Sequence, residues 1–177
     1  MFSNSTITVA TIADIPAIKD LLNVAYRGEI ASKTWTSEAH LIAGDTRTNE
    51  AELKRIMNLR GSVFLKYCIE GQTMDGCVNL QQHGNKIYLG MLSVSPFKQG
   101  AGIGKHLLKA AEEYASSLNC TSIYMTVISM RTELIDWYIR HGYTDTGERQ
   151  KFIENAVSGK HLQPLEFAVM EKFLFKK

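Results

Sequence analysis

The segment Ser95-Pro-Phe-Lys-Gln-Gly-Ala-Gly-Ile-Gly-Lys105 decides the fold, because it places a glycine-rich loop between a predicted strand and a predicted helix. The strand-like run 87–94 ends at Pro96, and from Gly102 onward apolar residues recur at helical spacing. Such a loop can direct backbone N–H groups outward at a helix N-terminus, where the helix dipole adds partial positive charge. Glycines also let a phosphate approach the backbone closely. The segment therefore predicts an anion-binding site.

Two common phosphate-binding motifs do not fit this loop. A Walker loop would need glycine at Gln99 and serine or threonine at His106. The dinucleotide fingerprint would accept Gly100 and Gly102 but would need a third glycine at Lys105. The loop therefore predicts neither a P-loop nucleotidase nor a dinucleotide-binding domain.

The other predicted elements surround this loop in a mixed order. Apolar periodicity and capping residues predict helices from Asp14 to Gly28, from Thr48 to before Gly61 and around 134–141. Short glycine- and asparagine-containing connections join the strand-like runs 63–70, 77–82 and 87–94 as antiparallel hairpins. The run 122–128 follows a helix, as in a crossover to a parallel partner. With 6–10, 143–149 and 166–174 as further strands, the sequence predicts an α+β fold with a mixed, mostly antiparallel sheet of about seven strands and flanking helices.

Length and composition predict one globular domain over residues 1–177. Hydrophobic residues make up 45% of the chain and charged residues 21%, and the net charge is +2. A dense basic run occurs only at Lys176 and Lys177, so we expect no nucleic-acid partner. We also expect no secretion signal and no membrane span, because no apolar stretch is long enough.

The cysteines support the expectation of a cytoplasmic protein without a metal site. There are three, and none has a second cysteine or a histidine at metal-ligand spacing. Such cysteines are typically buried free thiols, which suit a reducing cytoplasm. The three are Cys68, Cys77 and Cys120.

Two sequence blocks resemble one known family. The first is Q-x-x-G-x-G, formed by Gln99, Gly102 and Gly104, and the second is Tyr138-Ile-Arg-His-Gly142-Tyr143, which is similar to a Y-x-x-x-G-[FY] signature. With the order of elements over about residues 5–175, these blocks resemble the GNAT superfamily of acyl-CoA-dependent N-acyltransferases. The resemblance implies a sheet whose fourth and fifth strands splay apart and hold the pantetheine arm between them.

The resemblance also assigns residues to the acetyl-CoA site. It implies that the fourth strand supplies backbone groups to pantetheine and the thioester, that amides of the glycine loop hold the pyrophosphate, and that Ser129 and Met130 border the cleft. Arg131 stands where the family often has asparagine, so it is expected to meet either a phosphate or the acceptor. The expected donor-binding residues are Met91, Leu92, Val94, Gln99, Gly100, Ala101, Gly102, Ile103, Gly104, Lys105, Ser129 and Arg131.

The reaction implied is transfer of an acetyl group from acetyl-CoA to a primary amine of a small molecule through a tetrahedral intermediate. A backbone N–H near Met91 or Leu92 would stabilise the oxyanion, and Tyr138 would hydrogen-bond the leaving thiolate. Helical spacing alone would make Tyr138 a packing residue on an apolar face.

The acceptor side is less determined by the sequence. Glu29, Trp35 and Glu38 lie in the expected acceptor segment, and the base is open between Glu29, Glu38, His40 and water, because the fourth strand carries no carboxylate. Protein or peptide acetylation and a non-catalytic acyl-CoA sensor are the alternatives. The chain is compatible with a homodimer.

Overall fold

The computed structural model describes residues 2–28, 37–69, 72–154, 157 and 159–174. Seven strands form one open sheet in the order β1-β2-β3-β4-β5-β7-β6, and every neighbouring pair except β4 and β5 is antiparallel. The mixed, mostly antiparallel sheet predicted from the sequence is confirmed. The strands are β1 (Ile7–Val9), β2 (Ser62–Cys68), β3 (Met74–His83), β4 (Lys86–Val94), β5 (Ser122–Ile128), β6 (Thr144–Lys151) and β7 (Glu166–Phe173).

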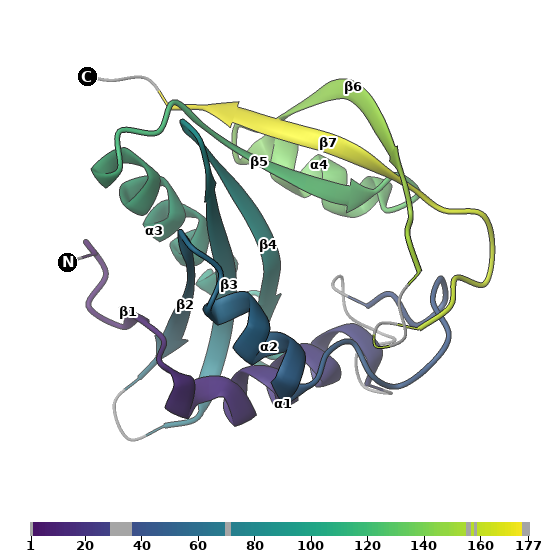
Figure 1. Ribbon diagram of the computed structural model, residues 1–177, viewed down its shortest axis with the longest axis horizontal. Coiled ribbons are helices and arrows are strands. Elements are labelled where there is room, and N and C mark those ends of the chain that lie inside the picture. The colour runs from purple at the N-terminus through teal and green to yellow at the C-terminus, as the bar shows by residue number, and fades with distance from the viewer. Residues whose placement is uncertain (1, 29–36, 70–71, 155–156, 158, 175–177) are drawn as a thin grey trace.

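The parallel pairing between β4 and β5 is short. It joins only three residue pairs, from Lys86 with Ser122 to Tyr88 with Tyr124. Beyond these pairs β5 stays hydrogen-bonded to β7 as far as Ile128, while β4 stays with β3. The two halves of the sheet therefore diverge, as Figure 1 shows, and the predicted splay is confirmed.

The described residues form four α-helices, which cover the two faces of the sheet (Figure 1). Successive residues of β2 point to opposite faces of the sheet. Phe64 packs with α1 and α2, whereas its neighbour Leu65 packs in the larger core under α3. The helices α3 and α4 thus lie on the opposite face from α1 and α2. Their bounds are α1 (Ile15–Arg27), α2 (Glu50–Met57), α3 (Ile103–Ser117) and α4 (Thr132–Arg140).

Helix α3 sits directly on the backbone of β3 at Gly76. A Cβ atom at this position would lie 2.8 Å from Cγ2 of Ile103 and 2.9 Å from Cδ1 of Leu107. Both distances are shorter than ordinary van der Waals contact, so a side chain here would have to push α3 away from the sheet. Gly76 thereby allows α3, the helix that begins at the glycine loop, to pack close to the sheet.

Two details differ from the sequence prediction. Asn49, rather than Thr48, caps α2, because the Asn49 side chain accepts a hydrogen bond of 2.8 Å from the Glu52 amide. Thr48 is instead buried next to α1. Cys77 and Cys120 are buried free thiols as predicted, but Cys68 is only half-buried.

The helices that the structure describes include none long and apolar enough to cross a membrane. Nor do its described residues bring three or more metal-ligating side chains together.

Replacing Gly76 by valine should destabilise the fold. Overpacking of this kind typically costs about 1–3 kcal/mol, and urea unfolding would measure it. Leu107→Val shortens one of the two contacted side chains. In a Leu107→Val background, Gly76→Val should therefore lower the free energy of unfolding by less than it does in the parent protein. Equal costs in both backgrounds would contradict the proposed contact.

Candidate functional site

A cleft of about 200 Å³ opens where β4 and β5 diverge. Gly90 to Leu92 of β4 form one wall, and Met125 to Ile128 of β5 form the other. Helix α1 contributes Tyr26 and Arg27, and α4 contributes Leu134 and Tyr138 from the opposite face. The remaining described lining residues come from connecting segments and neighbouring strand positions: Glu38, Ile42, Arg47, Tyr88, Leu89, Arg131, Phe152, Ile153 and Phe167.

A β-bulge distorts β4 at the cleft wall. The pairing with β3 shifts register between Cys77 and Asn79, so that Met91 and Leu92 together face a single residue of β3. Met91 has a φ angle of 53°, a left-handed conformation that is uncommon for a side chain of this size. Met91 and Leu92 of the bulge line the cleft.

Tyr26 holds this bulge from the side of α1. Its hydroxyl donates a hydrogen bond of 2.8 Å to the carbonyl oxygen of Leu92. Burial, and next the Glu38 carboxylate, raise the pKa of the Tyr26 hydroxyl, which therefore remains a donor. Cys77 lies behind the bulge, where burial raises the pKa of its thiol to about 12 and keeps it neutral.

Tyr138 reaches the cleft from α4 and is also part of the core. Its ring makes edge contacts with Trp137 and Tyr143, at centroid distances of 5.0 and 5.7 Å. Burial raises the pKa of the Tyr138 hydroxyl well above its ordinary value, and Tyr26 and Tyr143 add to the shift while Arg131 opposes it. Tyr138 is thus a protonated phenol that both packs in the core and lines the cleft.

The glycine loop forms a second hollow at the start of α3. Gly100 and Gly102 have φ angles of 85° and 79°, and a Cβ atom on either would meet no other atom within 4 Å. These glycines are therefore explained by backbone conformation and open space. Gly102 is the N-cap of α3 and offers no side-chain acceptor to the first helical amides. Lys98 and Lys105 line the same hollow and add positive charge.

The cleft and the loop hollow are adjacent. Leu92 lines the cleft and Val94, two residues further along β4, lines the hollow. Helix α4 connects them in the same way, because Tyr138 faces the cleft while the preceding Trp137 faces the glycine loop. One elongated ligand could therefore follow the free edge of β4 from the loop to the bulge.

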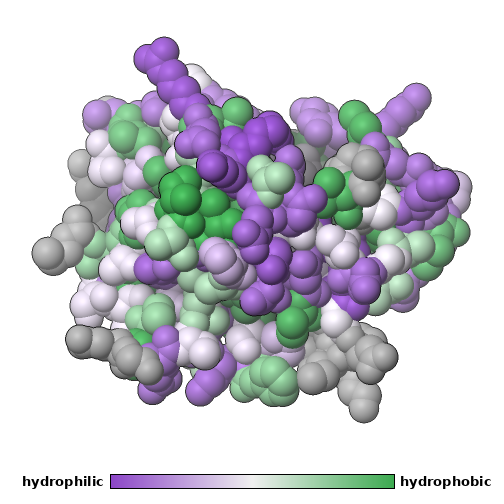
Figure 2. Space-filling view, turned by 60° about the horizontal axis from the view of Figure 1, so that its bottom comes forward, coloured by the Kyte–Doolittle hydropathy of each residue, from purple (hydrophilic) through white to green (hydrophobic). Residues whose placement is uncertain are grey.

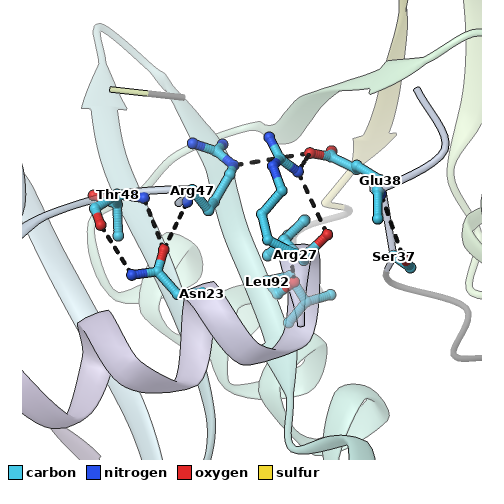
Figure 3. Close-up of polar contacts among 9 residues, drawn as sticks. Asn23, Arg27, Ser37, Glu38, Arg47, Thr48 and Leu92 are labelled. Atoms are coloured by element: carbon cyan, nitrogen blue, oxygen red, sulfur yellow. Dashed lines mark hydrogen bonds and ion pairs between the residues drawn. The ribbon is translucent and has the colours of Figure 1, made fainter. Parts of the chain in front are cut away.

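Polar side chains gather on the α1 side of the cleft. Arg27 Nη1 donates a hydrogen bond of 2.7 Å to Glu38 Oε2, and Arg47 Nε lies 4.0 Å from the same oxygen (Figure 3). The space-filling view, which turns the bottom of Figure 1 forward, shows hydrophilic residues gathered in the middle of this face between smaller apolar patches (Figure 2). Arg27, Glu38 and Arg47 thus form a charged wall on one side of the cleft between β4 and β5.

The structure brings most of the predicted residues to one of the two hollows. Met91, Leu92, Glu38, Arg131 and Tyr138 line the cleft, whereas Val94, Gln99, Gly100, Gly102, Ile103, Gly104 and Lys105 line the loop hollow.

The other predicted residues lie elsewhere. Ala101 and His40 are exposed and line neither hollow. Ser129 and Met130 also line neither hollow, although they lie in sequence between the lining residues Ile128 and Arg131. Glu29 and Trp35 fall outside the described residues. The predicted roles of all these residues stay predictions.

Sequence reasoning missed several lining residues. Tyr26 and Arg27 end a helix whose apolar periodicity drew attention only to its core face. Arg47 lies in a stretch without periodicity, so no pattern marked it. His141 lies within the second sequence block and Trp137 directly before it, and their ring centroids are 4.2 Å apart. Their closeness to the motif in the sequence was the available signal.

Comparison with known proteins places this geometry in one family. The model of the acetyltransferase (GNAT) family matches residues 20–143, and the chain belongs to that family. It is accordingly an acetyltransferase, and the family uses acetyl-CoA. Among curated proteins no sequence matches the chain.

Solved structures share the fold at low sequence identity. A ribosomal-protein-alanine N-acetyltransferase from Brucella melitensis is 20% identical, with a TM-score of 0.68 over 95% of this chain and 99% of that one. The Salmonella typhimurium protein yncA, solved with its cofactor acetyl-CoA, is 19% identical, with a TM-score of 0.68 over 99% and 96%. A chimera of the spermidine N-acetyltransferase SpeG from Vibrio cholerae and hSSAT is 17% identical, with a TM-score of 0.66 over 96% of each chain.

Gly102→Val should abolish stabilisation by acetyl-CoA, because the new side chain would fill the hollow in front of the loop amides. The matched control is Gly84→Val in the β3–β4 turn, where φ is also positive and the space is also open. Both variants should lose about 1–2 kcal/mol of stability through backbone strain. Thermal unfolding with and without acetyl-CoA measures both effects. Normal stabilisation of Gly102→Val would exclude the loop as the phosphate site.

Tyr26→Phe should destabilise the protein by about 1–3 kcal/mol, because it leaves the Leu92 carbonyl without its donor. Tyr143→Phe is the matched control, since the buried Tyr143 hydroxyl has no hydrogen-bond partner among the described residues. Removing that hydroxyl should cost little or even stabilise. Denaturant unfolding of both variants tests the contrast, and equal losses would argue against the role of Tyr26.

Proposed function

We propose that this protein, acting as one domain over residues 1–177, transfers an acetyl group from acetyl-CoA directly to a primary amine of a small molecule. The observation that carries the proposal is the adjacency of three features along one strand: the open glycine loop, the free edge of β4, and the bulge facing Tyr138. A thioester donor with a long diphosphate tail requires such an arrangement.

The chemistry of the donor set fits coenzyme A. Amides at the start of α3, together with Lys98 and Lys105, suit a diphosphate. Beyond Tyr88 the side of β4 that faces β5 has no strand partner, so its backbone groups can bind the amides of the pantetheine arm. The cofactor supplies the activated acetyl group, and these residues orient it.

The bulge is suited to stabilise the developing oxyanion. Aminolysis of a thioester moves negative charge onto the carbonyl oxygen, and a fixed backbone N–H stabilises that charge without reorganisation. The extra residue of a bulge leaves such a group outside the strand ladder. We assign this role to the backbone at Met91 and Leu92, whose position Tyr26 fixes.

Tyr138 is assigned to the departing thiolate. The raised pKa makes the phenol a weaker acid than a thiol, so it acts by hydrogen bonding as charge develops on sulfur. The aromatic contacts with Trp137 and Tyr143 hold the ring in position.

Glu38 is an unsuitable base in this arrangement. Its Oε2 atom already accepts a hydrogen bond from Arg27, so this oxygen is occupied by a structural ion pair. We assign Glu38 to an acceptor wall that it forms with Tyr26, Arg27 and Arg47 on the α1 side of the cleft. Water removes the amine proton.

A small acceptor suits the cleft better than a protein tail. Ile42 lines the cleft and forms a β-bridge with His161. Phe152 and Ile153, which follow β6, also line the cleft. Described residues therefore enclose the cleft on several sides. The retained Tyr138 argues against a sensor without catalytic activity.

A screen of primary amines with acetyl-CoA, read by release of free thiol, tests the function directly. Acetylated product must appear with the thiol in equal amounts. Stabilisation by acetyl-CoA without transfer to any amine would contradict the proposal and leave a binding protein.

Tyr138→Phe should lower kcat by roughly 10²-fold while the affinity for acetyl-CoA changes little. The ring that packs in the core is retained, so folding should survive. Because the phenol keeps its proton at every pH below its usual pKa of about 10, the parent should show no falling limb from Tyr138 ionisation in that range. A thioester with a more acidic thiol should recover part of the lost rate. Turnover at the parent rate, with chemistry rate-limiting, would make Tyr138 a packing residue only.

A further inference from the structure

Three side chains on one face of α1 organise the acceptor wall. Asn23, Tyr26 and Arg27 stand at positions i, i+3 and i+4, so they point in related directions from adjacent turns. Each makes a different contact with the segment that follows α1 or with the bulge of β4. The wall is therefore built on a rigid element.

Asn23 fixes the backbone at Arg47 and Thr48. Its side-chain oxygen accepts hydrogen bonds from the Arg47 amide at 2.7 Å and the Thr48 amide at 3.0 Å, and its nitrogen donates to the Thr48 carbonyl at 3.1 Å (Figure 3). These three bonds use both ends of one amide. An arginine in a segment without regular structure is thus held at a defined place.

The Arg47 guanidinium lies over the ring of Tyr26, 5.5 Å from its centroid. The hydroxyl of the same ring is bonded to Leu92 in the bulge assigned to the oxyanion. The cation is therefore separated from the reacting region by a single aromatic ring. The side chain of Arg47 is only 26% exposed, so its charge interacts with the cleft through less water than a surface arginine would.

Arg47 keeps hydrogen-bonding capacity for another anion. The nearest carboxylate, Glu38, is 4.0 Å from Arg47 Nε, and its Oε2 atom is already hydrogen-bonded to Arg27 at 2.7 Å. No carboxylate among the described residues lies within hydrogen-bond distance of the Arg47 guanidinium. A guanidinium can form two parallel hydrogen bonds with a carboxylate or phosphate group.

The charge of the described lining favours an anion as well. It contains three guanidinium groups, on Arg27, Arg47 and Arg131, and one carboxylate, on Glu38. A second carboxylate, on Glu133, bonds Arg131 Nε at 2.6 Å from outside the lining and is half-exposed. Like-charge repulsion would disfavour an acceptor with further ammonium groups, such as a polyamine.

We propose that the acceptor amine carries an anionic oxygen group, a carboxylate or a phosphate, and that Arg47 binds that group while the amine points at the bulge. This inference rests on the proposed acetyl transfer and names its acceptor class. Arg47 is a specificity-determining residue that does not touch the acetyl group.

Matched amine pairs separate this charge requirement from size. β-Alanine and γ-aminobutyrate are compared with their uncharged amides, aminopropylphosphonate represents the phosphate class, and spermidine represents polyamines. For the preferred anionic class, kcat/KM should exceed that of the matched neutral amine by about ten-fold or more, as expected for a charge-assisted hydrogen bond. The carboxylate and phosphonate compounds distinguish the two anion classes.

Arg47→Met removes the cation but keeps a long apolar side chain. It should reduce the preference for the anionic amine over its neutral partner to about one-fold, mainly by raising the KM for the anionic amine. The matched control is Arg55→Gln on α2, an exposed arginine that pairs with Glu52 and does not line the cleft. It should keep the full preference.

The outcomes separate the two proposals. Acetylation of neutral amines or spermidine as efficient as that of the anionic amines would overturn the acceptor class and leave the acetyl transfer standing. An anion preference that survives Arg47→Met would overturn the role of Arg47 and leave the anionic acceptor class standing. Failure to acetylate any amine would overturn both, and stabilisation by acetyl-CoA would then show whether donor binding remains.

Discussion

The early end of the parallel pairing between β4 and β5 is the constraint on which the site depends. After Tyr88 and Tyr124 each strand keeps only its outer neighbour, so β4 exposes a row of backbone groups inside the molecule instead of at its rim. An unpaired strand edge ordinarily invites association with another chain. Here the helices and connecting segments on both faces limit access to it, so the edge can serve a bound molecule.

Left-handed backbone conformations accompany this opening at two places. Met91 adopts a left-handed conformation in the bulge, and Gly100 and Gly102 adopt it in the loop. Such conformations persist only where surrounding contacts determine them. The hydrogen bond from Tyr26 to Leu92 and the close seat of α3 on Gly76 supply those contacts. Met91 lines the cleft, and Gly100 and Gly102 line the loop hollow.

The sequence pointed to more residues of the proposed donor half than of the proposed acceptor half, for a physical reason. The proposed donor site uses backbone groups. Their geometry requires glycines at fixed spacing and a strand before a helix, and both features leave a pattern in the sequence. The acceptor wall uses single side chains brought together by tertiary contacts. Asn23 meets Arg47 across a segment without periodicity, so neither residue carries a local signal. The cap of α2 differs from the prediction by one residue. Thr48 and Asn49 are both good caps, but in the structure the Thr48 amide bonds Asn23 and the Asn49 side chain caps the helix.

Tyr26 links the two halves physically. Its hydroxyl fixes the β4 bulge and its ring supports the cation of Arg47, so one side chain determines both where the oxyanion would form and where the acceptor's charge would rest. Because the donor half relies on the backbone, substitutions on the segment around Arg47 can change the charge of the acceptor wall without disturbing the glycine loop. The solved relatives with the same fold include acetyltransferases named for a ribosomal protein and for spermidine. In this chain the proposed donor site is built from backbone and the proposed acceptor wall from side chains, among them Arg27 and Arg47.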